Sequence, residues 1–238
     1  MNMGKLYCIG VGPGDPELLT LKALRILRDV NCICVPKGRE EGSSLALSIV
    51  KKVLDLNNKE IIEAYFPMRK TKGQDLCELD TRWNEIVDNI LKQLNQGIDV
   101  AFITMGDPTI YSTFFYLYDR LLELKADLPV EIIPGVSSIT AAASRANIAL
   151  GLGDERIAIL PANYMNDLEK TLELFDTVVL MKVHKAFENI LKILIKANLV
   201  DKAVYVLRAG LDDEKIFRDI RKVRKEDLNY FSLVVIKK

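Results

Sequence analysis

The stretch that decides the fold is Leu6-Tyr7-Cys8-Ile9-Gly10-Val11-Gly12-Pro13-Gly14-Asp15-Pro16, near the start of the 238-residue chain. The apolar run over residues 6–11 predicts a strand, and the glycines after it predict a tight turn whose backbone can approach a ligand closely. Apolar residues at helical spacing then predict a helix over residues 16–29, with Pro16 in its first turn. A strand, a glycine-rich turn and a helix in this order are typical of an α/β protein.

This first turn does not match the common phosphate-binding loops. Asp15 stands where the dinucleotide pattern G-x-G-x-x-G has its third glycine, and no Lys-Ser/Thr pair follows as in a P-loop. A carboxylate repels a phosphate, so the turn favours a neutral or cationic ligand. The alternative is a tight turn with a structural role only.

Strand and helix patterns alternate along most of the remaining chain. The expected strands cover residues 32–35, 61–66, 100–105, 130–133, 157–160, 177–181 and 203–207, and the expected helices cover 44–54, 76–95, 110–125, 139–146, 167–175 and 184–197. This alternation predicts mostly parallel sheets flanked by helices. Two last strands, over residues 215–219 and 231–236, leave little room for a helix and predict an antiparallel hairpin. A short polar segment ending at Pro129 predicts a boundary between a domain of residues 1–127 and one of residues 128–238.

Composition argues against several classes of function. The chain has 33 basic and 33 acidic residues, and this balance disfavours a general nucleic-acid binder. No apolar run of 18 residues and no signal-peptide pattern are present, so we expect a cytoplasmic protein that does not enter a membrane. The four cysteines form no C-x-x-C pair and His184 is the only histidine, so we expect packed free thiols and no metal site.

Two further turn motifs follow predicted strands. One is Gly106-Asp107-Pro108-Thr109-Ile110-Tyr111, and the other is Ile133-Pro134-Gly135-Val136-Ser137-Ser138. Ligands of open α/β sheets bind beyond the carboxyl ends of the strands, so both motifs are candidate binding turns. Helix capping by Asp107, Ser137 or Ser138 is the alternative for each motif.

The three motifs, in this order, resemble the tetrapyrrole methylases over essentially the whole chain. The resemblance implies two α/β domains with an active-site cleft between them. It also implies that the first turn lines the substrate side of the cleft and that the other two turns hold S-adenosylmethionine. The cofactor contacts that it implies are Pro13, Met105, Gly106, Asp107, Ile110, Ser137, Ser138, Met181 and Gly210, with Leu160, Pro161 and Ala162 as further candidates. Met181 could instead be ordinary core.

Five segments resemble the branch of this family that methylates C20 of precorrin-2. They are Tyr65-Phe66-Pro67-Met68, Tyr111-Ser112-Thr113-Phe114, Ile159-Leu160-Pro161-Ala162, Val179-Leu180-Met181-Lys182 and Tyr230-Phe231-Ser232-Leu233. The implied activity is methyl transfer from S-adenosylmethionine to C20 of precorrin-2 or cobalt-factor II, in cobalamin biosynthesis, by a homodimer. One alternative is a family member that acts on another precorrin, a protein residue or RNA. A non-catalytic nucleotide-binding scaffold is the alternative from another class.

The implied reaction needs few catalytic side chains, because a sulfonium methyl group is already activated and has mainly to be aligned. A base must still take the C20 proton, and the candidates are Asp15, Tyr111 and His184. Asp15 could instead cap the helix that starts at Pro16. The implied substrate carries eight carboxylates. Its expected contacts are Gly12, Gly14 and Asp15 in the first turn and the basic residues Arg69, Lys70, Lys72, Lys182 and Arg208, for which ordinary surface charge is the alternative.

Overall fold

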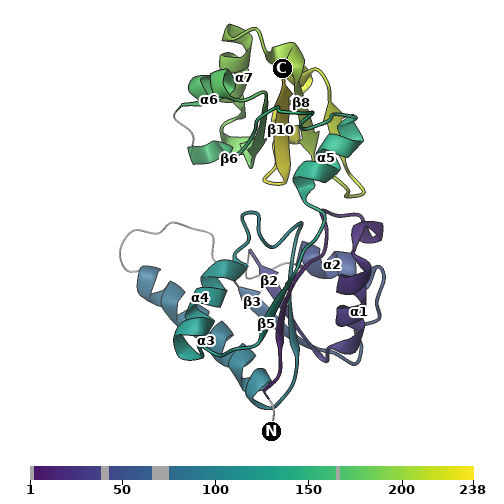
Figure 1. Cartoon of the computed structure of the whole chain (residues 1–238), viewed down its shortest axis with the longest axis vertical. Helices are drawn as coiled ribbons and strands as arrows, with labels where there is room; N and C mark the ends of the chain where they lie inside the picture. The colour runs from purple at the N-terminus through teal and green to yellow at the C-terminus, as the bar shows by residue number, and fades with distance from the viewer. Residues whose placement is uncertain (1–2, 39–42, 66–74, 165–166) are drawn as a thin grey trace. The chain divides into compact units, whose positions relative to one another are not determined.

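A computed structural model describes residues 3–38, 43–65, 75–164 and 167–238, without the side chains of residues 75–80 and 164. The chain divides into two compact units, Met1–Ser137 and Ser138–Lys238 (Figure 1). The expected boundary between residues 127 and 128 lies before the strand β5 (Val130–Ile133), whereas the observed division lies after it. This strand belongs to the N-terminal unit because it pairs with the first strand of the chain.

The N-terminal unit is built on a five-stranded sheet in the order β3-β2-β4-β1-β5. Every neighbouring pair in this sheet is parallel, as the alternation of strands and helices predicts. Besides β5, the strands are β1 (Leu6–Gly10), β2 (Cys32–Lys37), β3 (Glu60–Tyr65) and β4 (Val100–Thr104).

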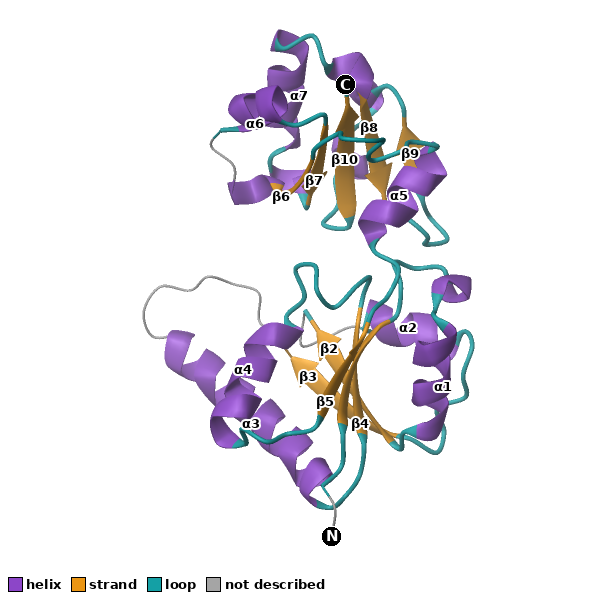
Figure 2. Cartoon of the chain, viewed as in Figure 1, coloured by secondary structure: helices purple, strands orange, loops and turns teal. Residues whose placement is uncertain are grey.

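Helices cover both faces of this sheet (Figure 2). The helices α1 (Leu21–Asp29) and α2 (Leu45–Lys51) pack on one face, and α3 (Asp75–Asn95) and α4 (Phe114–Leu124) pack on the other. Successive strand residues alternate between the two cores, as in β1, where Cys8 faces α3 and α4 and Ile9 faces α1 and α2. The thiols of Cys8, Cys32 and Cys34 are buried and free, which confirms the prediction for these three cysteines. The side chain of Cys77 lies outside the described residues.

Two helices of this unit begin later than the sequence predicts. Residues 16–18 form a separate 3-10 turn, and α1 begins at Leu21 because the Thr20 hydroxyl caps it by accepting a hydrogen bond from the Ala23 N–H at 3.1 Å. The expected start of the fourth helix at residue 110 is wrong as well. Tyr111 has a left-handed backbone with φ 54°, so α4 begins only at Phe114.

The C-terminal unit contains a second five-stranded sheet, in the order β6-β7-β10-β8-β9. Its strands are β6 (Ile157–Pro161), β7 (Thr177–Met181), β8 (Ala203–Leu207), β9 (Lys215–Phe217) and β10 (Ser232–Lys237). The pair β6–β7 is parallel, but β10 runs antiparallel to both β7 and β8, and β9 runs antiparallel to β8. Parallel pairing is therefore complete in the first sheet and limited to one pair in the second.

The expected hairpin of the last two strands is wrong. The strand β9 pairs with β8, and β10 lies between β7 and β8. The physical reason is visible in β10 itself, whose residues Ser232–Ile236 are all buried. A strand that is buried on both faces is more stable in the centre of a sheet than at its edge.

Helices also cover both faces of the second sheet. The helices α6 (Leu168–Leu174) and α7 (Phe187–Lys196) share a core with one face of the strands. The helix α5 (Ser138–Ala146) lies against β8 and β10 on the other face (Figure 2). A 3-10 turn over Val183–Lys185 precedes α7, so the helix expected from residue 184 begins three residues later, at Phe187.

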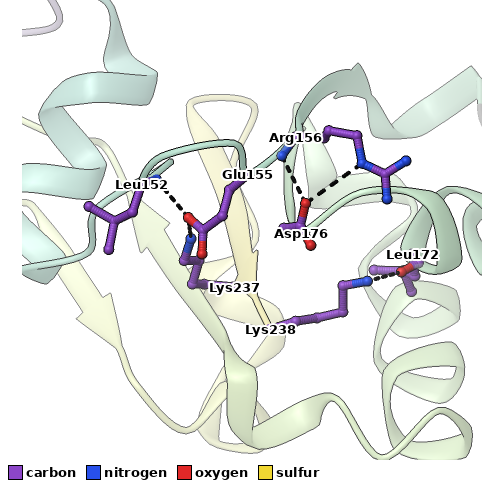
Figure 3. Close-up of polar contacts among 7 residues, drawn as sticks. All are labelled: Leu152, Glu155, Arg156, Leu172, Asp176, Lys237 and Lys238. Atoms are coloured by element: carbon purple, nitrogen blue, oxygen red, sulfur yellow. Dashed lines mark hydrogen bonds and ion pairs between the residues drawn. The ribbon is translucent and has the colours of Figure 1, made fainter.

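Polar contacts join the end of β10 to the segments before β6 and β7 (Figure 3). Lys237 pairs with Glu155, and the Lys238 ammonium donates to the Leu172 carbonyl at 2.9 Å. The Asp176 carboxylate accepts a hydrogen bond from the Arg156 N–H at 2.8 Å. These contacts hold the start of β6 and β7 to the end of the central strand. Within the described residues, no helix is long and apolar enough to span a bilayer.

Candidate functional site

The first two motifs follow the neighbouring strands β1 and β4. At this point of the first sheet, the connections to the next strand run in opposite directions. The chain leaves β1 towards β2 on one side, and it leaves β4 towards β5 on the other. The intervening helices α1 and α4 pack on opposite faces of the sheet. In open α/β sheets such a switch point is where ligands bind, beyond the carboxyl ends of the strands.

A backbone bridge joins the turns that follow β1 and β4. The Gly106 N–H donates to the Gly12 carbonyl at 2.7 Å, and the Gly12 N–H donates to the Gly106 carbonyl at 3.4 Å. Both residues have left-handed backbones, with φ 79° at Gly12 and 68° at Gly106, which glycine adopts without a steric penalty. The first and second motifs therefore form one connected structure.

The third motif, after β5, joins this structure through one side chain. The Asp107 Oδ2 atom accepts a hydrogen bond from the Gly135 N–H at 3.0 Å, and its Oδ1 atom accepts one from the Thr109 N–H at 2.8 Å. The backbones are also in close contact, because a Cβ atom on Gly10 or Gly135 would lie 2.5 or 2.3 Å from the Gly106 carbonyl oxygen. Only glycine fits at these two positions.

The remaining first-turn residues surround this bridge. Pro13 and Gly14 are buried, whereas Asp15 is half-buried. The Asp15 Oδ1 atom accepts a hydrogen bond from the Glu17 N–H at 2.9 Å, so Asp15 caps the short 3-10 turn, as one of its two sequence readings predicts.

Other expected contacts of this unit differ in exposure. Tyr111 is exposed, while Met105, Ile110 and Ser137 are half-buried. Among the basic candidates, Arg69, Lys70 and Lys72 lie outside the described residues.

The expected contacts of the C-terminal unit lie at the carboxyl ends of β6, β7 and β8. Pro161 is the register partner of Met181, and both are half-buried. The side chains of Leu160 and Ala162 pack into the core beside α6 and α7, so these residues would meet a ligand through their backbone. Gly210 follows β8 with φ 78°, and its N–H donates to the Glu214 carboxylate at 2.7 Å. Ser138 is half-buried at the first position of α5.

Two of the predicted substrate-binding cations follow strands at this same edge. Lys182 comes directly after β7, and its ammonium lies 5.5 Å from the centre of the Tyr230 ring. Arg208 comes directly after β8, and its Nε atom lies 2.6 Å from Asp213 Oδ1. Both side chains are half-buried.

His184 lies two residues after Lys182, in the 3-10 turn Val183–Lys185, and packs edge-on against Tyr230, with ring centres 5.8 Å apart. Burial lowers the pKa of His184 below its ordinary value; the positive charge of Lys185 adds to this, and a hydrogen bond with the Lys182 backbone opposes it. The lowered pKa favours the neutral form of the imidazole. Its Nδ1 atom is buried and has no hydrogen-bond partner in the part of the chain that the structure describes.

The turns after β1 and β4 in the N-terminal unit carry negative charge, since they contain Asp15 and Asp107. This suits a cationic ligand and disfavours a phosphate. The described residues hold no cluster of histidine, cysteine and acidic side chains that could bind a metal ion. The closely packed glycine turns support binding and alignment of a ligand by backbone groups.

Sequence reasoning missed several contributors to the site. Gly10 and Gly135 belong to the first and third motifs, but their role in backbone packing depends on the pairing of β1 with β4 and β5. Asp213 and Glu214 were not predicted, although the acidic run Asp212-Asp213-Glu214, separated from Gly210 by one residue, could have indicated partners for that loop.

Comparison with known proteins defines the family. The model of the tetrapyrrole (corrin/porphyrin) methylases matches residues 5–222, and the chain belongs to this family. A probable cobalt-precorrin-2 C(20)-methyltransferase of Methanocaldococcus jannaschii is 40% identical over 98% of this chain and 96% of its own length. The cobalt-precorrin-2 C(20)-methyltransferase of Salmonella typhimurium is 34% identical over 99% of this chain and 97% of its own length. The precorrin-2 C(20)-methyltransferase of a Sinorhizobium species is 30% identical over 99% of this chain and 96% of its own length.

Solved structures share the fold. A cobalt precorrin-4 methyltransferase superposes with a TM-score of 0.74 at 23% identity and covers 98% of this chain and 94% of its own. The uroporphyrin-III C-methyltransferase of Thermus thermophilus, solved in complex with S-adenosylhomocysteine, superposes with a TM-score of 0.66 at 23% identity and covers 99% and 98%. These likenesses show that the two-unit α/β fold is that of the tetrapyrrole methyltransferases.

Proposed function

We propose that this protein transfers a methyl group from S-adenosylmethionine to C20 of precorrin-2 or its cobalt form, in cobalamin biosynthesis. The observation that carries the proposal is the joining of the three family motifs at the switch point of the first sheet, through Gly12, Gly106, Asp107 and Gly135. The three relatives described above, at 40%, 34% and 30% identity, are named as C20-methyltransferases, which supports the choice of position on the ring.

The residues present fit S-adenosylmethionine. Left-handed glycines at Gly106 and Gly210 and the small residues Ser137 and Ser138 leave backbone close to any ligand at these turns. Within the N-terminal unit, the half-buried apolar side chains of Met105 and Ile110 suit the adenosine part of the cofactor. Asp107 is already engaged by Thr109 and Gly135, so its role is to hold the turns in place as well as to give them negative charge.

The chemistry follows from the activated methyl group that S-adenosylmethionine supplies. The new C–C bond at C20 forms with the electron pair of the tetrapyrrole, the S–CH3 bond breaks with its pair left on sulfur, and C20 then loses a proton. The protein has to align the two ligands and exclude water. Asp15, Tyr111 and His184 remain the candidates for the proton acceptor; burial lowers the pKa of His184 and so favours the neutral imidazole, the form that can accept a proton.

The cobalt form is the favoured substrate of the two. The relatives at 40% and 34% identity are named for cobalt-precorrin-2, and the relative at 30% is named for precorrin-2. Cobalt would arrive as part of the substrate, so the protein needs no metal site of its own.

We also propose a homodimer that works in the cytoplasm, where the thiols of Cys8, Cys32 and Cys34 would stay reduced. Light scattering at micromolar concentration should give twice the chain mass. A monomer mass would reject the dimer and leave the activity proposal untouched.

Two experiments test the proposed activity. Titration calorimetry should show binding of S-adenosylhomocysteine and none of ATP, whereas a nucleotide-binding scaffold would show the reverse. An anaerobic assay should then compare precorrin-2 with cobalt-factor II at equal concentrations. Methylation of the cobalt form at the higher kcat/KM is expected. Methylation of neither tetrapyrrole by a protein that binds S-adenosylhomocysteine would contradict the proposed substrate.

A further inference from the structure

Five described residues other than glycine have a left-handed backbone: Tyr111, Asn147, Lys182, Asn198 and Arg208. Asn147 and Asn198 follow the helices α5 and α7, where asparagine commonly ends a helix in this conformation. Lys182 and Arg208 instead follow the strands β7 and β8, with φ 58° and 53°. A long side chain is unfavourable in this conformation and glycine is the ordinary choice, so a role for the side chain is needed to explain both residues.

The backbones of Lys182 and Arg208 are held in the same way. The Lys182 N–H donates to the Ser232 carbonyl at 3.0 Å, and the Arg208 N–H donates to the Phe231 carbonyl at 2.7 Å. Ser232 is the first residue of β10 and Phe231 directly precedes it, and β10 lies between β7 and β8. Neighbouring strands are about 4.8 Å apart, so the two backbones are separated by about 10 Å.

Each cationic head lies against a partner at the surface. The Lys182 ammonium lies over Tyr230, which is 39% exposed. The Arg208 guanidinium contacts Asp213, whose side chain is 63% exposed. The Arg208 head is thus already placed to bind a carboxylate, and the carboxylate that it binds is one that a ligand can replace.

We propose that Lys182 and Arg208 bind two peripheral carboxylates of one tetrapyrrole, and that Asp213 occupies the Arg208 position until the ligand arrives. The identity of the ligand rests on the proposed function. The placement of the two cations rests on the C-terminal unit alone. An unfavourable backbone at both positions is retained because the cations recognise the substrate.

Glycine substitution separates recognition from folding. Lys182→Gly and Arg208→Gly remove the cation and also relieve the left-handed backbone, so the melting temperature should stay within about 2 °C of the wild type or rise. The Kd for uroporphyrin III, a stable tetrapyrrole with eight carboxylates, should rise at least tenfold in each variant by fluorescence titration. The KM for the methylated tetrapyrrole should rise in parallel, while the Kd for S-adenosylhomocysteine should change less than twofold.

Matched controls exist in the same chain. Asn147→Gly and Asn198→Gly make the same backbone change at helix ends, and both should leave tetrapyrrole binding unchanged. The charge-conserving variants Lys182→Arg and Arg208→Lys should recover most of the affinity. Asp213→Asn should bind uroporphyrin III more tightly, by a factor of about two to five, because a competing carboxylate is gone.

Several results would overturn the proposal. One is an unchanged affinity for uroporphyrin III in both glycine variants. Another is a loss of affinity for S-adenosylhomocysteine as large as the loss for uroporphyrin III. A third is a wild-type protein that does not bind uroporphyrin III. The two proposals fail separately. If the protein binds uroporphyrin III through these cations but methylates neither tetrapyrrole, the binding site is supported and the proposed activity is rejected. A protein that methylates C20 with an unchanged KM in both variants keeps the activity and loses the site.

Discussion

The Asp107 carboxylate accepts a hydrogen bond from the Gly135 N–H at 3.0 Å, although 28 positions separate the two residues in the chain. Its second oxygen accepts from the Thr109 N–H at 2.8 Å. One side chain therefore holds the turn after β4 to the turn after β5. Since Gly106 also bridges to Gly12, all three motifs depend on a small number of contacts at one edge of the first sheet.

Loss of the Asp107 carboxylate should affect both stability and cofactor binding. Asp107→Ala leaves the Gly135 and Thr109 N–H groups without their acceptor, and we expect the free energy of unfolding to fall by about 1–3 kcal/mol. The affinity for S-adenosylhomocysteine, measured by calorimetry, should fall at least tenfold. The control is Asp55→Ala, because Asp55 accepts a hydrogen bond from the Asn57 N–H at 3.0 Å in a local turn of the same spacing. Binding as in the wild type by Asp107→Ala would show that the joined turns are not the cofactor site.

Two glycine substitutions with the same steric conflict should differ in their effect on ligand binding. An added Cβ at Gly135 would lie 2.3 Å from the Gly106 carbonyl oxygen, and one at Gly4 would lie 2.3 Å from the Ile98 carbonyl oxygen. We expect both Gly135→Ala and Gly4→Ala to lower the melting temperature. Only Gly135→Ala should weaken binding of S-adenosylhomocysteine, because Gly4 precedes β1 at the opposite edge of the sheet. Equal losses of affinity in both variants would mean that destabilisation alone explains the effect.

Asp15→Asn tests whether the charge of Asp15 takes part in turnover. Asparagine caps a turn about as well as aspartate, so the hydrogen bond to the Glu17 N–H and the melting temperature should be kept. We expect turnover to fall at least about tenfold, or about 1.4 kcal/mol of barrier, with an unchanged affinity for S-adenosylhomocysteine. Asp219→Asn is the matched control, since Asp219 caps another 3-10 turn through the Arg221 N–H at 3.2 Å. Wild-type turnover in Asp15→Asn would return Asp15 to a capping role alone.

The ion pairs of Glu131 should give the fold a dependence on acid pH. Hydrogen bonds from Lys22 and then Lys5 lower the pKa of Glu131 from 4.5 to about 2. Because the folded-state pKa lies below the unfolded value, this contribution is complete above about pH 4.5 and is lost as the pH falls towards 2. The melting temperature of Glu131→Gln should therefore lie below that of the wild type at pH 7 and approach it near pH 2. A difference that does not change with pH would contradict the ion-pair assignment. Added salt should reduce the difference at pH 7, because the half-buried Glu131 carboxylate and its two lysine partners still reach solvent.

The sequence was sufficient to locate the strands of the first sheet, but the boundary expected between residues 127 and 128 assigned β5 to the wrong unit. Apolar runs and glycine turns identified every strand of the N-terminal unit, because a buried parallel strand is a short, nearly continuous apolar segment. The three motifs could be placed at strand ends for the same reason. Their mutual contacts could not be predicted, because the bridge between Gly12 and Gly106 depends on the order of the strands in the sheet.

Tertiary contacts account for the predictions that were wrong. Because β9 and β10 are neighbours in sequence, the sequence predicts that they pair with each other. The burial of β10 on both faces instead favours its central position between β7 and β8. The helix expected from residue 110 is interrupted by the left-handed Tyr111, which no local pattern indicated. The left-handed backbones of Lys182 and Arg208 could not be predicted either, since lysine and arginine have no preference for that conformation.

The position of the transferred methyl group tests the central claim most directly. The purified protein should be incubated anaerobically with cobalt-factor II and S-adenosylmethionine labelled with carbon-13 in its methyl group, and the product should be examined by NMR. A single labelled methyl group on the C20 meso carbon, with one S-adenosylhomocysteine formed per product, is the predicted result. A labelled methyl group at any other ring position, or a label transferred only to protein or RNA, would contradict the account.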